Sequence, residues 1–271
     1  MKERAIVEKK INRSVARALD MLELVAKSPD ELTISEISRQ LAIPKSTAFD
    51  IITTLLDKGY LDLANDRLKS LKLGVKLFQT GAVYLDQTPL HKAARPILED
   101  LSAEAKETSF LAIENDGLLV YLDKVESPES VRTSAGIGSN NPMYCTGLGK
   151  ALLATMPDET IKTTITRMGG LKPVTPYTIT SEEQFFNIIA ESRQRGYVID
   201  DREHNMDVFC VAAPIYNAYG KAQAAISIAS LFTKIKNNPE RIAILGKLIS
   251  EAALNLSHNI GFRGNKLYRE F

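Results

Sequence analysis

The chain has 271 residues, 44% of them hydrophobic and 25% charged, with a formal net charge of +1. These values are typical of a soluble globular protein with one large or two ordinary domains, and the near-neutral charge argues against a protein that coats nucleic acid without sequence preference. No apolar run approaches the roughly 18 residues of a membrane helix, and the N-terminus lacks the apolar core of a signal peptide. We therefore expect a cytoplasmic protein with no membrane association. Its two cysteines, Cys145 and Cys210, are too few for a disulfide framework and are expected to be free thiols.

The basic residues are concentrated toward the N-terminus. Residues 1–80 carry 14 Lys and Arg against 11 Asp and Glu, a net of +3, whereas the remainder carries 20 against 22. Residues 1–11 form a basic arm, and the excess continues through Arg13 and Arg17. Such an arm could lie along the phosphates of a nucleic acid, but a solvated, frayed terminus explains the same composition.

Residues 12–72 are predicted to form a winged helix-turn-helix. The first helix, residues 14–27, is amphipathic and ends at a Ser-Pro-Asp sequence. Its predicted buried stripe consists of Val15, Ala18, Leu19, Leu22 and Val25 or Ala26.

The next two helices form the helix-turn-helix itself. Thr33 and Glu36 have the spacing of a capping box, which begins a helix running to about Leu41. Pro44 cannot continue that helix but can open the next one, which ends at Gly59. The apolar residues of that next helix recur with helical spacing at Ala48, Ile51, Ile52, Leu55 and Leu56. Two helices joined by a tight turn, with a polar outer face, fit the major groove of DNA.

Several polar residues of this domain are candidates for DNA contact. On the third helix the outward positions are Lys45, Ser46, Thr47, Phe49, Asp50, Thr53 and Thr54. The first three lie at the helix N-terminus, which attracts a phosphate. A hairpin over residues 60–71, turning at 64–66, would be the wing, and its Arg67, Lys69 and Lys72 suit contact with the DNA backbone. An ordinary exposed hairpin would carry such residues as well.

Phe49 and Asp50 are the ambiguous members of this set. Thr47 and Phe49 could touch base edges or a thymine methyl group, but Phe49 could equally be a partly buried packing residue. Asp50 would repel phosphate unless it accepts a hydrogen bond from a cytosine amino group. It is therefore either a specificity device or turned aside.

Residues 73–89 are predicted to form a linker helix that Pro89 ends. Val75, Phe78, Ala82 and Leu85 recur at three- and four-residue steps, a narrow seam that could pack against a second copy or against its own chain.

Residues 90–262 are predicted to form a second domain of α+β class, an antiparallel sheet with helices packed against it, followed by a tail over 263–271. An Asn-Asp-Gly turn joins its first two strands, and Thr180 with Glu183 is expected to cap one of its helices. The predicted strands are 109–114, 118–125, 131–135, 208–216 and 222–231, with a flexible loop over 136–142. One amphipathic helix is predicted from Leu90 onward, and further helices are predicted at about 158–168, 181–195 and 239–258.

Five segments, in the same order, resemble the IclR family of bacterial transcriptional regulators. SVARALDMLELVA, LAIPKSTAFDIITTLLDKGYL and LKLGVKLFQTG resemble its first helix, its recognition helix with the start of the wing, and its wing-to-linker junction. NPMYCTGLGKALLA and GYVIDDREHNMDVFCVAAPIYNAYGKAQAAISIAS resemble the two most characteristic segments of its effector domain. The resemblance covers about residues 12–262.

The resemblance implies both an architecture and a function. A winged helix-turn-helix, a linker helix and a GAF- or PAS-like antiparallel effector domain are expected. So is a homodimer or dimer of dimers on a palindromic operator in double-stranded DNA. A small organic acid in the effector domain would control operator affinity, without a cofactor, and we expect a repressor.

The resemblance also implies ligand-binding residues. Gly147 and Leu148 open a helix after a Gly-rich segment, where free amides could hold a carboxylate, although a plain Gly-rich helix start explains the same residues. By position in the family's motifs, Asp200 could bind a ligand hydroxyl or hydrated carbonyl, Cys210 would face the pocket, and Ser227 would complete it.

In the effector domain, three positions depart from the family's usual pattern. Ala229 stands where a second Ser is usual, Arg202 where an acidic residue is usual, and Asp207 where a Gly is usual. These changes suggest a ligand other than the glyoxylate- and pyruvate-type acids; sugar acids, keto acids and aromatic acids all remain open. Arg202 could add a carboxylate partner or be an ordinary exposed loop residue.

Another class of function has to be weighed against this one. Cys210, His204 and Asp200 could serve a cysteine-dependent enzyme or a zinc-binding sensor. However, their spacing is not diagnostic, and Cys210 opens an apolar strand, where Cys usually packs as a small hydrophobe. We expect no enzymatic activity.

Overall fold

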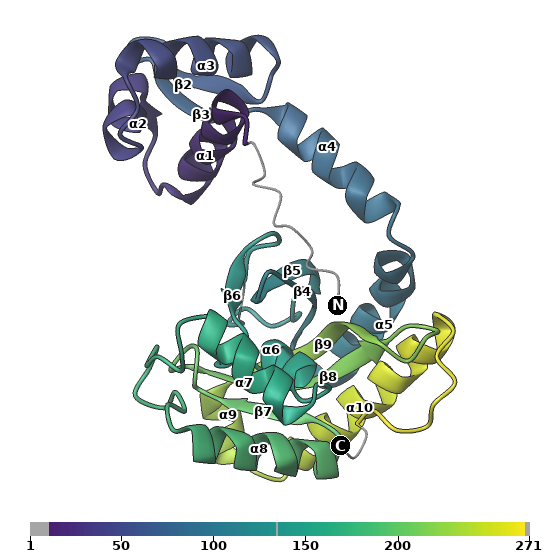
Figure 1. Ribbon diagram of the computed structural model, residues 1–271. Helices are drawn as coiled ribbons and strands as arrows, with labels where there is room; N and C mark the ends of the chain where they lie inside the picture. Colours follow the sequence, from purple (N-terminus) through teal and green to yellow (C-terminus); the bar gives the residue numbers. More distant parts are fainter. Residues whose placement is uncertain (1–10, 134, 269–271) are drawn as a thin grey trace, which may run out of the picture. The chain divides into compact units, whose positions relative to one another are not determined.

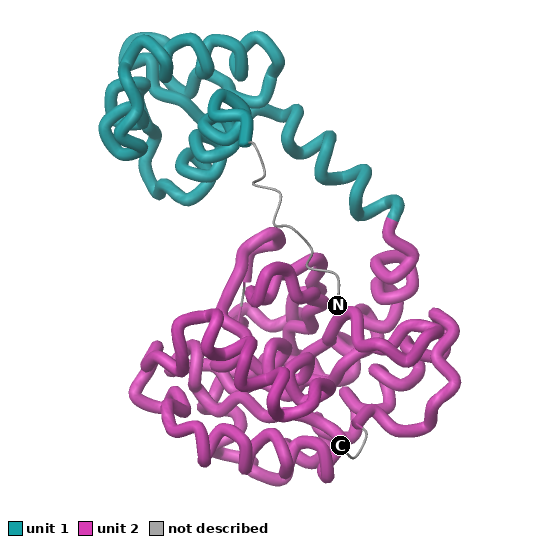
Figure 2. Tube along the Cα trace, viewed as in Figure 1, with its two compact units in different colours: residues 1–87 teal, residues 88–271 magenta. Residues whose placement is uncertain are grey.

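The computed structural model describes residues 11–133 and 135–268. The chain divides into two compact units, Met1–Gln87 and Thr88–Phe271 (Figure 2). The expected basic arm lies almost wholly outside the described residues, as do the last three residues of the expected tail. No helix among the described residues is long and apolar enough to cross a membrane.

The first unit is a winged helix-turn-helix, as predicted (Figure 1). Its small sheet has the order β1-β3-β2, with β1 and β2 each antiparallel to β3. The two-residue strand β1 was not predicted, because it is too short to show an alternating pattern. The elements are α1 (Arg13–Lys27), β1 (Leu32–Thr33), α2 (Ile34–Gln40), α3 (Lys45–Asp57), β2 (Leu61–Asn65), β3 (Ser70–Leu73) and α4 (Val75–Asp86).

Local signals set the helix boundaries. The predicted capping box is present: the Thr33 hydroxyl accepts from the Glu36 N–H at 3.4 Å, and Glu36 accepts from the Thr33 N–H at 2.7 Å. Gly59 follows α3 with a φ of +73°, a conformation that favours glycine. Gly74 caps α4 where no side chain fits, because a Cβ there would lie 2.2 Å from the Gly59 carbonyl oxygen.

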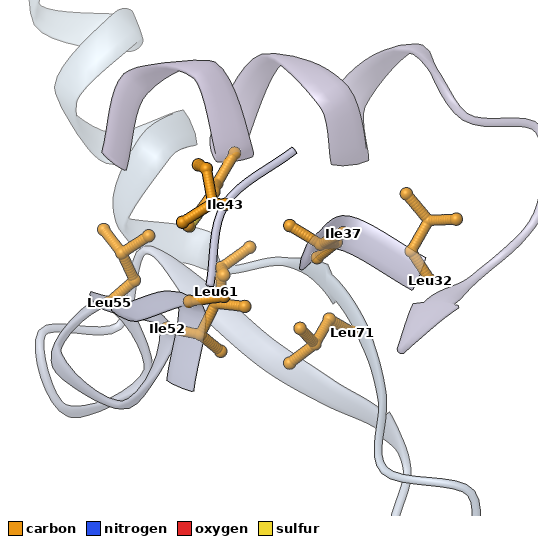
Figure 3. Packing of buried hydrophobic residues seen from close by; sticks show 9 residues of the cluster. Leu32, Ile37, Ile43, Ile52, Leu55, Leu61 and Leu71 are labelled. Atoms are coloured by element: carbon orange, nitrogen blue, oxygen red, sulfur yellow. The ribbon is translucent and has the colours of Figure 1, made fainter. Parts of the chain in front are cut away.

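The core of the first unit is formed by helices α1, α2 and α3 and the sheet (Figure 3). Its buried members are Met21, Leu32, Ile37, Ile43, Ala48, Ile52, Leu55, Leu61 and Leu71. The predicted stripe of α3 lies on this core. That of α1 is partly wrong, because Met21 is the buried residue, whereas Val15 and Leu19 are 57% and 55% exposed. Helix α1 has apolar residues on two faces, and periodicity alone does not say which face meets the core.

Helix α4 buries none of its residues within its unit. Of the predicted seam, Ala82 and Leu85 are half-buried, whereas Val75 and Phe78 are 64% and 75% exposed. The described residues therefore leave the first half of the seam uncovered and partly cover its second half.

The second unit is built on a six-stranded antiparallel sheet of order β6-β5-β4-β9-β8-β7, which confirms the α+β class. Helix α6 packs on β7, β8 and β9, α5 packs on β4 and β5, and α10 packs mainly on β8. The elements are α5 (Pro89–Ala105), β4 (Thr108–Asn115), β5 (Leu118–Val125), β6 (Asn140–Pro142), α6 (Gly147–Leu153), α7 (Asp158–Arg167), α8 (Glu182–Arg195), β7 (Val198–Asp201), β8 (Val208–Tyr216), β9 (Ala222–Leu231), α9 (Phe232–Asn237) and α10 (Arg241–Asn259).

Two predictions for this unit are wrong in detail, and two short elements were not predicted. No strand occurs in the described part of 131–135, where Val131 is exposed, and the third strand is instead β6, within the expected loop. A β-branched residue favours a strand only where its side chain has a sheet surface to pack on. Ser181, not Thr180, caps α8 by accepting from the Gln184 N–H. Strand β7 and helix α9, both short, were not predicted.

Candidate functional site

A cavity of about 370 Å³ opens in the second unit. Strands β4, β5, β7, β8 and β9, the start of α6 and the segment after β7 all contribute to its lining. All five residues singled out from the sequence as ligand contacts line this one cavity: Gly147, Leu148, Asp200, Cys210 and Ser227.

The two glycines at the start of α6 are required by packing. A Cβ on Gly147 would lie 2.9 Å from Cys210 Sγ, and one on Gly149 would lie 2.3 Å from the backbone of Met143. Thr146 caps the helix by accepting from the Gly149 N–H at 3.2 Å. The backbone N–H of Gly147 acts on the carboxyl group of Asp200 and lowers its pKa. One of the two amides expected to face a ligand therefore lies beside Asp200.

Asp200 is buried on β7 and accepts a backbone hydrogen bond. Its Oδ1 accepts from the Glu203 N–H at 2.9 Å, and the Gly147 N–H also favours the ionised carboxyl group. Burial raises the pKa of this carboxyl group from 3.8 to about 7, although Lys150 acts in the opposite direction. Near neutral pH, Asp200 can therefore donate a hydrogen bond as well as accept one.

A buried ion pair between Lys150 and Glu203, next to Asp200, was not predicted from the sequence. The side chain of Lys150 is fully buried, and its Nζ donates to the Ile199 carbonyl at 2.7 Å and to the carboxylate of Glu203. A lysine near the start of a helix normally reaches solvent. The only sequence signal was its place inside the apolar run of α6.

Cys210 and Ser227 lie on neighbouring strands beside the cavity. Burial raises the pKa of the Cys210 thiol to about 12. Ser227 Oγ is buried next to this thiol, a weak partner, and no other described group forms a hydrogen bond with it. A buried serine hydroxyl facing a cavity is well suited to a ligand oxygen, because an unsatisfied polar group is unfavourable there.

The geometry opposes both alternatives based on Cys210. A nucleophilic cysteine must form a thiolate, and burial keeps this one protonated. His204 also lines the cavity, and burial lowers its pKa. Among the described residues, no group of three or more His, Cys, Asp or Glu side chains is arranged to hold a metal ion.

Arg202 is not among the residues that line the cavity, which opposes the alternative in which it binds a ligand carboxylate. Its guanidinium group lies between two aromatic rings, 3.8 Å from the centroid of Tyr177 and 3.7 Å from that of Phe232. It also pairs with Asp201 at 2.8 Å. Arg132, which was not singled out in the sequence, lines the cavity instead.

The polar face of the first unit carries the other predicted residues. Lys45, Ser46, Phe49 and Asp50 on α3 are exposed, and Thr47 is half-buried. Phe49 is 55% exposed, so it is not the packing residue of the alternative interpretation. On the wing, Arg67, Lys69 and Lys72 are all exposed. The N-terminus of α3 has no side-chain cap, so no capping side chain occupies its first amides.

An exposed helix-turn-helix with a basic wing, joined in one chain to a domain with a polar cavity, defines a ligand-responsive DNA-binding regulator. Residues 14–63 match the IclR helix-turn-helix domain, and residues 82–258 match the domain described as bacterial transcriptional regulator IclR C-terminal. The chain therefore belongs to the IclR family of transcriptional regulators. Members of this family bind DNA and are not enzymes, as expected from the sequence.

Individual relatives match over nearly the whole chain. The transcriptional repressor IclR of Escherichia coli is 31% identical over 243 residues, which cover 89% of this chain and 87% of the relative. The crystal structure of IclR from Thermotoga maritima has 28% identity and a TM-score of 0.75, covering 92% of this chain and 99% of that one. An IclR homologue from Microbacterium hydrocarbonoxydans, solved with 4-hydroxybenzoate, shares the fold with a TM-score of 0.77 and 24% identity over 91% of this chain and 98% of that one.

Proposed function

We propose that this protein is a repressor that binds a palindromic operator, and that a small organic acid in the cavity controls its operator affinity. The observation that carries the proposal is the convergence of five predicted contact residues, from α6, β7, β8 and β9, on one cavity. Repression is favoured by the likeness to a protein named as a repressor. Binding to operator DNA would place the protein in the cytoplasm.

In this proposal α3 enters the major groove of double-stranded DNA. Lys45, Ser46 and Thr47 hold a phosphate at the uncapped helix N-terminus. Phe49 and Asp50, exposed on the same helix, reach base edges. Arg67 and Lys69 bring the wing to the DNA backbone.

Two copies are proposed to act together on the operator, as a homodimer or a dimer of dimers. The residues that support pairing are exposed and apolar in the first unit: Val15, Leu19, Val75, Phe78, Val83 and Tyr84. A net charge of only +3 over residues 1–80 also favours two copies, because one weakly basic module binds DNA weakly.

The division of labour along the chain follows from these roles. Residues 12–72 bind DNA, preceded by the basic arm 1–11, and residues 73–89 link them to the effector domain, residues 90–262, with 263–271 as a tail. In the effector domain Asp200, Cys210 and Ser227 contact the acid together with Gly147 and Leu148. No cofactor is needed for this function.

The proposal is tested with an operator selected from random double-stranded DNA and with a panel of acids. Glyoxylate, pyruvate, gluconate and 4-hydroxybenzoate are screened by thermal shift, because a ligand that binds the folded state raises its stability. Operator affinity is then measured with and without each acid that binds.

Two variants of cavity residues sharpen this test. Asp200→Ala and Ser227→Ala should abolish the response to the acid while operator binding without acid stays intact. Thr163→Ala, an exposed substitution on α7, is the control and should respond as the wild type does. A normal response of both cavity variants would show that the effector binds elsewhere.

A further inference from the structure

The charges that line the cavity leave one place for an anion. Of the described lining residues, Asp200 and Asp207 are acidic, Arg132 is the one guanidinium or ammonium group, and burial lowers the pKa of His204. Lys150 is unavailable to a ligand, because its buried ammonium group is paired with Glu203. An acid in this cavity therefore finds a full positive charge only at Arg132.

Arg132 at present holds a carboxylate of the protein. Its Nε and Nη2 donate to Glu126 Oε2 at 2.9 and 2.7 Å, and its side chain is 37% exposed. Lys124 Nζ lies 2.9 Å from the other oxygen of Glu126. Exposed ion pairs stabilise a fold only weakly, and Glu126 would keep Lys124 if Arg132 turned to a ligand. Exchanging one carboxylate for another on Arg132 therefore costs little.

The backbone next to Arg132 is fixed to the sheet. The Thr108 hydroxyl donates to the Thr133 carbonyl at 3.0 Å, and the Thr133 hydroxyl donates to the Ala229 carbonyl at 3.3 Å. Ala229 is paired with Cys210 across the sheet, and Cys210 with Asp200. Ala229, the sheet position that holds Thr133, is therefore two strands away from Asp200, a backbone separation of about 10 Å. An acid that spans this distance, with its carboxylate at Arg132 and its far end at Asp200, is longer than pyruvate.

We propose that Arg132 is the carboxylate-binding, specificity-determining residue of this cavity, and that it exchanges Glu126 for the carboxylate of an effector whose far end reaches Asp200 and Ser227. The effector is then an acid built on a ring or a sugar-length chain, with a hydroxyl or carbonyl oxygen at that far end. Phe110 and Tyr121, which meet edge to face at 5.4 Å, supply an apolar wall for its body. This inference rests on the proposed effector function and assigns the binding mode within it.

Calorimetric titration with matched acids and amides tests this assignment. The probes are 4-hydroxybenzoate with 4-hydroxybenzamide, gluconate with gluconamide, and pyruvate with pyruvamide. We expect one of the two longer acids to bind the wild type more tightly than pyruvate. Arg132→Gln should weaken the binding of that acid by 10-fold or more and the binding of its amide by less than threefold, because the amide carries no charge for Arg132 to hold.

Three further variants separate binding from folding. Arg132→Lys should keep the preference for acid over amide, because the charge remains. Glu126→Gln should increase the affinity for the acid several-fold, because it removes the competing carboxylate. Arg167→Gln, an exposed substitution on α7, should change nothing.

The possible failures are distinguishable. Undiminished binding of the long acid to Arg132→Gln, or an equal loss of acid and amide, overturns the role of Arg132 while the effector function stands. Tighter binding of pyruvate than of both longer acids overturns the end-to-end binding mode. If none of the acids binds the wild type, the organic-acid effector falls, and this inference falls with it.

Discussion

Asp200, Glu203 and Lys150 place two carboxyl groups and one ammonium group in a buried part of the second unit. Lys150 pairs with Glu203, so among the described residues Asp200 has a backbone donor but no cation in hydrogen-bond contact. A buried carboxylate without a counter-ion is unfavourable, which is why burial dominates the pKa of Asp200. The same burial makes Asp200 a group that titrates near neutral pH.

Stability should therefore fall with rising pH through the range in which Asp200 loses its proton. The pKa of Asp200 is raised from 3.8 to about 7 on folding. The folded state then holds the proton more tightly than the unfolded state, so this contribution is full below pH 4 and lost as the pH passes 7. Relative to Asp200→Asn, which does not titrate, the wild type should lose about 2 to 4 kcal/mol of unfolding free energy between pH 4 and pH 8. Urea denaturation across this range measures the difference.

The control for this experiment is Glu104→Gln, which makes the same charge change at an exposed position on α5. Its stability profile should run parallel to that of the wild type. Parallel profiles for Asp200→Asn as well would mean that Asp200 stays ionised throughout.

At the scale of elements, the N-terminus of α3 concentrates the proposed phosphate contacts. Lys45→Ala should weaken DNA binding to specific and random sequences alike and lower the salt dependence by about one ion per copy. Phe49→Ala should instead change which sequences are bound and leave the salt dependence unaltered, because it removes no charge. Fluorescence anisotropy at several salt concentrations distinguishes the two.

Lys58→Ala is the matched control, because Lys58 is an exposed lysine at the other end of the same helix. It should leave both affinity and salt dependence close to those of the wild type. A salt dependence of Lys45→Ala equal to that of the wild type would show that α3 does not present this end to phosphate.

Substitution by alanine should have opposite effects at Gly74, the N-cap of α4, and at Gly81, within α4. Gly74→Ala should destabilise the first unit by several kcal/mol, because its Cβ would overlap the carbonyl group of Gly59. Gly81→Ala meets nothing within 4 Å and removes a flexible residue from a helix, so it should stabilise by about 1 kcal/mol. Thermal denaturation of the two variants gives the sign of each change, and a neutral Gly74→Ala would contradict the close approach of α4 to Gly59.

Elements with a local signal were predictable from the sequence, and those set by distant partners were not. The capping box at Thr33 and the stripe of α3 depend on neighbouring residues, and both are present. Strand β7 ends in two aspartates and is held by pairing with β8, so its own residues do not favour a strand. Lys150 and Arg132 were missed for a related reason. The partners of Lys150 come from β7 and the segment after it, and the cavity beside Arg132 is formed by strands distant in sequence.

At the scale of the whole molecule, the chain places the helix-turn-helix and the effector domain in separate units. The boundary between Gln87 and Thr88 falls between α4 and α5, inside the stretch predicted to be a linker. The apolar side chains that α4 leaves exposed are adjacent in sequence to that boundary. A change of state in the effector domain would reach the operator through a segment that a second copy is proposed to contact.

The two buried thiols carry a practical consequence. Cys145 and Cys210 are both buried, and burial raises the pKa of each thiol to about 12, so neither forms the thiolate that oxidants and alkylating reagents attack. Both thiols should therefore react slowly with such reagents in the folded protein. Cys210 lines the cavity, and Gly147 packs against its sulfur. The rate at which a maleimide labels Cys210 therefore reports transient opening of the site. A bound effector should slow this labelling by stabilising the closed site.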